Sequence, residues 1–150
     1  MVFAKSEGTK RALQANWRRT DKRYLAVVEG RPPADHGVLR SHLDESSPFK
    51  VYGAPPSEQT RHAVTNYRVV KHNATRTLIE LTPETGRRHQ IRVHLADAAC
   101  PIIGDHKYGA RTNPARRLAL HASSLQFTHP SSGELLRFES PLPQELAGLV

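Results

Sequence analysis

Apolar and polar residues alternate along several stretches of the chain, a pattern typical of β-strands that bury one face. The alternation is clearest in residues 62–71 and 76–82, which flank a short turn at Asn73. Two such stretches joined by a short turn predict an antiparallel hairpin that positions the segment after it. The core side chains predicted for this hairpin are Val64, Tyr67, Val69, Leu78, Ile79 and Leu81.

A further strand is predicted at residues 22–29, which are rich in β-branched and aromatic side chains. Gly30, Pro32 and Pro33 follow directly and would end this strand. Shorter strands are expected at residues 1–5, 38–43, 49–52, 118–128 and 135–139, and a helical tail at 141–150.

A first helix is predicted at residues 7–19, where the spacing of apolar residues changes to that of a helix. Ser6 is a suitable N-cap for it. The helix would bury Ala12, Leu13 and Trp17 against the core.

A second helix is predicted from near Arg88 to Ala99, because Pro101 cannot continue it. Three apolar residues at helical spacing would face the core: Ile91, Leu95 and Ala98.

Cations gather at the start of this second helix. Arg88 and His89 lie four and three residues before Arg92, so the three side chains would project together. Cations at this end oppose the helix dipole. An anionic partner would compensate, and phosphate is the obvious candidate.

Charge is distributed unevenly along the 150 residues, a length that suits one domain. The net charge is +8; residues 1–31 carry eight basic and three acidic side chains, and residues 84–117 carry seven and three. Two basic segments so far apart would meet along one nucleic-acid groove if folding brings them together.

The single cysteine, Cys100, excludes an internal disulfide and fits a reducing cytoplasm. Its position before Pro101 indicates a small buried side chain and not a nucleophile. No apolar run is long enough to cross a membrane and no signal peptide is evident, so we expect a cytoplasmic protein. His89 and His94 are five residues apart and do not share a helix face, so no metal site is predicted.

The stretch TPETGRRHQIRVHLADAACPIIGDHKYG, residues 82–109, carries a pattern with many fixed positions. It resembles the signature T-G-R-x-H-Q-I-R-V-H-L followed by P-I-x-G-D-x-x-Y-G of the RluA-type RNA pseudouridine synthases. Two further segments are similar to motifs of the same family. They are K-R-Y-L-A-x-V-E-G at residues 22–30 and L-H-A-x-x-L-x-F-x-H-P at residues 120–130.

The resemblance implies roles for ten residues. Arg92 matches the arginine that pairs with the catalytic aspartate of the family, and Tyr24 matches the tyrosine that lies against the target base. Either Leu118 or Leu120 would line the uracil pocket. RNA contacts are expected from Arg87, Arg88 and His89, and also from Gln90, Lys22 and Arg23. No metal or organic cofactor is implied.

One motif of the family is absent. The H-R-L-D segment with the nucleophilic aspartate normally lies just before V-F-A-K-S, which is residues 2–6 here. The nearest match, His42-Leu43-Asp44, comes after the Tyr24 strand and has Pro48 in place of glycine, so we interpret Asp44 as a turn residue. The remaining aspartates lack the context of the motif, and Asp105 is interpreted as structural; they are Asp21, Asp35, Asp97 and Asp105.

The resemblance therefore implies an α+β fold with a mixed, mainly antiparallel sheet and flanking helices, truncated at its N-terminus. Residues 1–150 would be a partial pseudouridine synthase catalytic domain that is inactive alone. Its front half would be an upstream extension or a separate chain, and the protein would otherwise be a monomer. Exposed strand edges would make the isolated chain prone to aggregate.

Two other interpretations remain open at the level of sequence. The chain could be a non-catalytic remnant that still binds structured RNA. It could also be a small basic ribosome-associated or DNA-binding protein that shares the second helix by chance. The last interpretation predicts no preference for RNA that contains uridine and no effect of changing Arg92.

Overall fold

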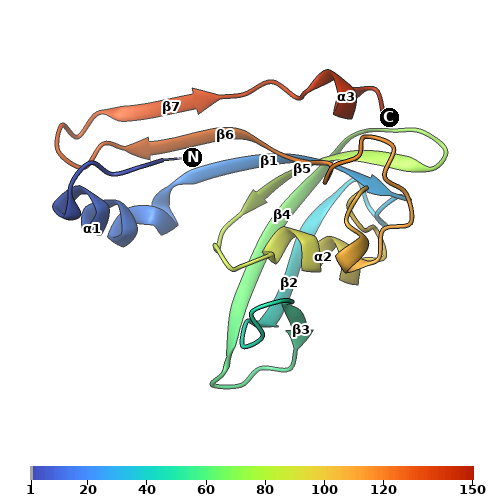
Figure 1. Cartoon of the computed structure of the whole chain (residues 1–150), viewed down its shortest axis with the longest axis horizontal. Coiled ribbons are helices and arrows are strands. Elements are labelled where there is room, and N and C mark those ends of the chain that lie inside the picture. Colours follow the sequence, from blue (N-terminus) through green and yellow to red (C-terminus); the bar gives the residue numbers. More distant parts are fainter. Residues whose placement is uncertain (1) are drawn as a thin grey trace.

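The computed structural model describes residues 2–150, which form one curved sheet with short helices beside it (Figure 1). All six pairs of neighbouring strands are antiparallel, so the predicted α+β class with a mainly antiparallel sheet is confirmed. The strand order is β3-β2-β4-β5-β1-β6-β7. The strands are β1 (Asp21–Glu29), β2 (His36–Asp44), β3 (Tyr52–Ala54), β4 (Thr60–His72), β5 (Arg76–Pro83), β6 (Leu120–Thr128) and β7 (Leu135–Glu139).

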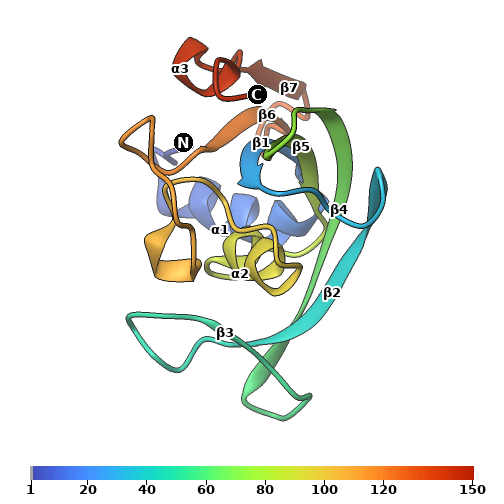
Figure 2. The same ribbon diagram turned by 90° about the vertical axis from the view of Figure 1, so that its right-hand side faces the viewer.

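The helices are short and carry few of the buried side chains. They are α1 (Glu7–Asn16), α2 (Gln90–Asp97) and α3 (Gln144–Ala147), with 3-10 turns at Trp17–Arg19 and His106–Tyr108. Figure 2 shows α2 on the concave side of the sheet. No helix in the described part of the chain is both long and apolar enough to span a membrane.

The main core lies where β1 and β5 meet α2 and the loop after it. The predicted hairpin is confirmed as β4 and β5, and its residues Leu78, Ile79 and Leu81 are buried. Ile91 and Leu95 of α2 pack into the same cluster. Each such side chain stabilises the fold by about 1.5–3 kcal/mol through burial, so this core fixes the position of α2 against the sheet.

A smaller core holds the arm formed by β2, β3 and the far half of β4, which extends from the body in Figure 1. It comprises Leu43, Val51, Ala63, Val93 and Tyr108. Because Val93 belongs to α2 and Tyr108 to the second 3-10 turn, this cluster ties the arm to both elements.

The prediction for the N-terminal segment was partly wrong. Residues 2–5 form no strand, and Met1 lies outside the described residues. Ser6 does cap α1, because its Oγ accepts a hydrogen bond of 3.2 Å from the Thr9 amide. However, α1 buries no residue, and Trp17 is 37% exposed. An amphipathic pattern shows which face of a helix is apolar, but not that a second surface covers it.

The ends of several other elements also differ from prediction. The second helix begins at Gln90, and its N-cap His89 has a left-handed backbone with φ 54°. Residues 49–51 lie outside β3, and the C-terminal helix covers only residues 144–147. Arg88 therefore precedes the helix, and the helical spacing that grouped it with Arg92 does not apply.

Candidate functional site

A cleft of about 390 Å³ opens where the start of β1, the turn before α2 and the start of β6 meet. It gathers seven of the ten residues that the sequence analysis selected, from segments far apart in the chain: Lys22, Tyr24, Arg87, His89, Gln90, Arg92 and Leu120. The rest of its wall is formed by Trp17, Pro83, Thr85, Gly86 and Ile91.

The other three selected residues lie outside the cleft. Arg23 alternates to the other face of β1 and lies 3.6 Å from Asp21. Leu118 and Leu120 both pack against the main core, and of the two only Leu120 lines the cleft. Arg88 binds the carbonyl oxygens of residues 45, 47 and 48 and so braces the loop after β2. Arg88 thus has a structural role in this loop, and its contact with RNA stays a prediction.

Tyr24 is half-buried in β1, where the register with β6 shifts between Arg23 and Tyr24. Burial raises the pKa of its phenol, so the side chain stays neutral. The ring reaches the cleft beside Leu120 and Lys22 and gives it an aromatic wall. A flat neutral ring of this kind can hold a nucleobase by stacking.

Arg92 is held in place by Asp105. Its Nε donates to Asp105 Oδ2 at 2.8 Å and its Nη2 donates to Oδ1 at 2.7 Å. The Asp105 side chain is 1% exposed, whereas that of Arg92 is 20% exposed. The guanidinium also lies over the Tyr108 ring, 4.7 Å from its centroid. Hydrogen bonding to Asp105 raises the pKa of Arg92, which keeps the guanidinium charged.

The sequence analysis matched Arg92 to the arginine that pairs with the catalytic aspartate of the family, and within this chain Arg92 pairs with Asp105. Asp105 is more than a loop residue, because it orients the guanidinium and leaves Nη1 without a hydrogen bond to the described groups. The sequence marked Asp105 only as part of a motif. A buried carboxylate beside a motif arginine is a signal that could have suggested the pair.

The loop that carries Asp105 depends on Gly104. This residue has φ +82°, and a Cβ added there would lie 2.2 Å from the carbonyl oxygen of Arg117. Only glycine fits this turn, which brings Asp105 under the end of the Arg92 side chain.

Gln90 braces the turn before α2. Its Oε1 accepts hydrogen bonds from the Thr85 hydroxyl at 2.7 Å and the Arg87 amide at 3.0 Å. Its Nε2 donates to the Val64 carbonyl and to the Thr65 hydroxyl. The amide is therefore fully used within the protein. Gln90 is thus placed to shape the cleft wall, and its contact with RNA stays a prediction.

A buried histidine extends this network below the cleft. His94 Nδ1 lies 2.9 Å from the Thr65 hydroxyl, and its Nε2 lies 3.0 Å from that of Ser41. Burial lowers the pKa of His94 to about 4, so its ring is neutral at neutral pH. Thr65 therefore joins β4 to α2 through Gln90 and His94.

The cleft is positively charged. Lys22, Arg87 and Arg92 all line it, and its wall contains no carboxylate among the described residues. Asp105 pairs with the inner side of Arg92. Asp44 accepts the Ser46 amide at 2.8 Å, as expected for a turn residue. Such a surface attracts polyanions, because cations focused in a cleft raise the local concentration of phosphate groups.

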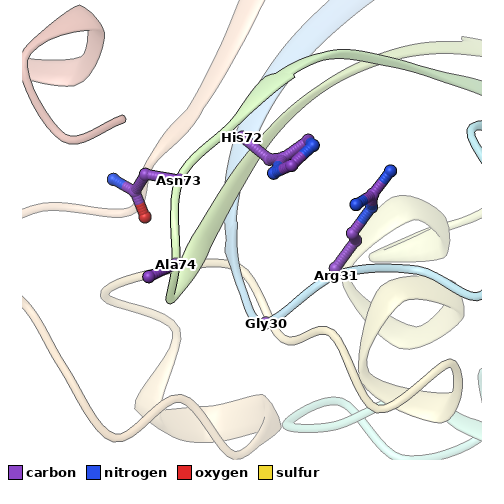
Figure 3. A pocket seen from close by; sticks show the side chains of 5 residues that line it. All are labelled: Gly30, Arg31, His72, Asn73 and Ala74. Carbon is purple, nitrogen blue, oxygen red and sulfur yellow. The ribbon is translucent and has the colours of Figure 1, made fainter.

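Two further hollows differ from the cleft in their lining. An apolar hollow of about 720 Å³ over β6 and β7 shares Trp17, Lys22 and Tyr24 with it. The hollow in Figure 3 lies beside the turn between β4 and β5, where Arg31 and His72 point into the same space. Arg31 already pairs with Asp35 at 2.9 Å, and none of the selected residues lies there. Across the described residues, no three His, Cys, Asp or Glu side chains could together hold a metal ion.

Comparison with known families and structures gives a consistent result. The family model described as RNA pseudouridylate synthase matches residues 1–97. The chain is 39% identical to ribosomal large subunit pseudouridine synthase D of Nitrosomonas europaea, over 93% of this chain and 42% of that protein. It is also 39% identical to YhcT of Bacillus subtilis, an uncharacterized RNA pseudouridine synthase, over 99% of this chain and 50% of that one.

The fold agrees with these sequence matches. The structure of human RNA pseudouridylate synthase domain containing 4 has a TM-score of 0.77 to this chain. The two are 26% identical, and the match covers 95% of this chain and 66% of the human one. The chain spans about half the length of the curated relatives that it matches.

Proposed function

The chain belongs to the RNA pseudouridine synthase family, and from this premise we propose that its cleft binds a uridine turned out of ribosomal or transfer RNA in the cytoplasm. The observation that supports this most strongly is the convergence of Tyr24, Arg92 and Leu120 on one basic cleft. A base that reacts must leave its stack, so the pocket has to hold it while cations hold the backbone.

The reaction sets the demands on the cleft. In uridine the bond from N1 to C1′ breaks and a bond from C5 to C1′ forms, while C5 loses a proton and N1 gains one. The change is an isomerisation, so it requires no oxidant and no group donor. Tyr24 offers a stacking surface worth about 1–3 kcal/mol, and Leu120 offers an apolar contact. Arg87 would hold a phosphate beside the base. Lys22 is 7% exposed and donates to the Trp17 carbonyl oxygen, so it would add positive charge to the cleft wall.

The family resemblance assigns the nucleophile to an aspartate, and we propose that this carboxylate enters the cleft from polypeptide outside these 150 residues. The cleft wall has no carboxylate among the described residues, and Asp105 is engaged by Arg92. The free Nη1 of Arg92 could receive the incoming carboxylate. A close guanidinium lowers the pKa of a carboxylate and keeps it ionised.

The test uses a stem-loop RNA with tritium at C5 of its uridines, because pseudouridine formation releases that hydrogen to water. The purified chain is expected to bind the RNA but release no tritium. Release is expected when the part of the Nitrosomonas europaea relative outside the match is expressed separately and added. The Arg92→Gln variant should abolish this release, and Arg137→Gln, on exposed β7, should not. Release by the chain alone would contradict an external nucleophile.

A second function is favoured by the same absence of a carboxylate in the cleft. The chain could act as a non-catalytic RNA-binding protein, for example on the ribosome. It would then bind the stem-loop with the same dependence on Arg87. No added segment would produce tritium release, and this outcome separates the two functions.

A further inference from the structure

The hydroxyl of Tyr108 lies between two nitrogen atoms. It accepts a hydrogen bond of 3.0 Å from the amide of Val51, and it lies 2.8 Å from Nδ1 of His89. Tyr108 is 8% exposed, and its hydroxyl has no other partner among the described groups. A buried hydroxyl group needs an acceptor for its hydrogen, so the Tyr108 hydroxyl donates a hydrogen bond to His89 Nδ1.

This hydrogen bond fixes the tautomer of His89. Since Nδ1 accepts, the ring proton of the neutral imidazole must lie on Nε2. The surroundings keep the ring neutral, because partial burial and then the nearby charges of Arg92, Lys107 and Arg88 lower its pKa, against a smaller opposing effect of Asp105.

The fixed N–H belongs to a ring in the cleft wall. His89 lines the cleft, and Nε2 forms no hydrogen bond with the described groups. The two nitrogen atoms of imidazole diverge, so Nε2 points away from Tyr108. The backbone of His89 is left-handed, with φ 54°, which costs a residue other than glycine about 1–2 kcal/mol. The chain therefore keeps a strained histidine where glycine would fit the turn more easily.

We propose that His89 is a specificity-determining residue that donates Nε2–H to the C4 carbonyl oxygen of the uracil base. The inference rests on the proposed function, because it requires a nucleobase in this cleft. Cytosine has an amino group at C4, so it would place a second donor against Nε2–H. A donor left without an acceptor in a desolvated site weakens binding, and His89 thereby distinguishes uridine from cytidine.

A phosphate oxygen is the other acceptor that RNA offers. The Tyr108 hydroxyl argues against it. The imidazolium that binds phosphate most strongly is protonated on Nδ1, and it would leave the buried Tyr108 hydroxyl proton without an acceptor. A phosphate contact would also release a counterion and so contribute to the salt dependence of binding, whereas a base contact would not.

The first experiment is independent of RNA. Nitrogen-15 chemical shifts of the imidazole rings in the purified chain report which nitrogen carries the proton. His89 is expected to be neutral with its proton on Nε2, and Tyr108→Phe should release this preference and raise the pKa of the ring. A wild-type ring protonated on Nδ1 would overturn the inference and leave the proposed function untouched.

The second experiment compares two stem-loop RNAs that differ only by uridine or cytidine at one unpaired position. The wild-type chain should bind the uridine RNA roughly five- to thirtyfold more tightly. Tyr108→Phe and His89→Phe should reduce this ratio toward one without changing the salt dependence. His36→Phe, at an exposed histidine of β2, is the matched control and should keep the ratio.

The outcomes separate the two proposals. Equal binding of both RNAs by the wild-type chain, or a lower salt dependence in His89→Phe, would overturn the base contact alone. Absence of RNA binding would overturn the proposed function and this inference together.

Discussion

At the scale of single residues, the ion pair of Arg92 and Asp105 links the fold to the cleft. The carboxylate is almost fully buried, and the guanidinium reaches from it to the cleft wall. Removal of one partner of such a pair leaves the charge of the other buried without an opposite charge, which destabilises the folded chain.

Asp105→Asn is therefore expected to lower the free energy of unfolding by about 2–4 kcal/mol. The surface pair of Arg117 and Glu145, whose side chains are 43% and 52% exposed, provides the control. Glu145→Gln should change stability by less than about 0.5 kcal/mol, because solvent screens exposed pairs. Urea unfolding of both variants measures the two changes in the free energy of unfolding. Equal changes would show that the buried pair of Asp105 stabilises the fold no more than the exposed pair does.

His94 predicts how stability depends on pH. The pKa of its ring is about 4 in the folded chain, against 6.5 as the ordinary value. The unfolded chain thus binds the proton more readily, and the contribution of His94 is complete above pH 6.5 and lost as the pH falls toward 4. The loss should approach roughly 3 kcal/mol. The measurement compares urea unfolding of wild type and His94→Gln from pH 7 to pH 4.5; parallel curves would contradict the prediction.

At the scale of elements, α2 has a left-handed residue at each end. His89 begins it with φ 54°, and Ala99 ends it with φ 57°. At the C-terminal end the Cys100 amide donates to the Leu95 carbonyl at 2.9 Å, which is the six-to-one bond of a Schellman motif. The side chains at the two ends have different surroundings. His89 forms a hydrogen bond with Tyr108, whereas Ala99 is exposed to solvent.

Ala99→Gly is expected to stabilise the chain by about 0.5–1 kcal/mol, because glycine adopts the left-handed backbone without strain. Ala98, one residue earlier, has φ −80° and serves as the control. Ala98→Gly should destabilise the chain by a similar amount, since there glycine only adds freedom to the unfolded state. Thermal melting of both variants tests this, and a shift of the same sign in both would argue against it.

Local patterns in the sequence predicted the elements that depend on local spacing. The hairpin of β4 and β5 and the buried positions Ile91 and Leu95 of α2 follow from periodicity. The strand around Tyr24 follows from its β-branched and aromatic residues. The start of α2 was predicted too early, because no sequence pattern indicates that the backbone of His89 is left-handed. As a result Arg88 was grouped with Arg92, although it braces a different loop.

Local patterns do not predict strand order or contacts between residues that are distant in the sequence. Nothing local shows that β1 lies between β5 and β6, although that order brings Tyr24 and Leu120 to one cleft. The pair of Arg92 and Asp105 spans thirteen residues across a helix end and a loop. The hydrogen bond from Tyr108 to His89 likewise depends on the fold of that loop.

At the scale of the whole molecule, two basic segments far apart in sequence do meet. Lys22 comes from the first and Arg87 and Arg92 come from the second, and all three line one cleft. An apolar hollow adjoins this cleft over β6 and β7 and shares three of its residues. Phe127 and Phe138 stack there at 6.0 Å, and Phe138 remains 54% exposed.

The central claim is that this cleft receives a uridine base, and photochemical crosslinking tests it most directly. The chain is irradiated with a stem-loop RNA that carries one 4-thiouridine at an unpaired position, and the attached peptides are identified by mass spectrometry. The account predicts crosslinks to the peptides that contain Tyr24 or His89, with their loss when unlabelled uridine RNA competes. Crosslinks confined to α1 or to the arm of β2 and β3 would contradict it.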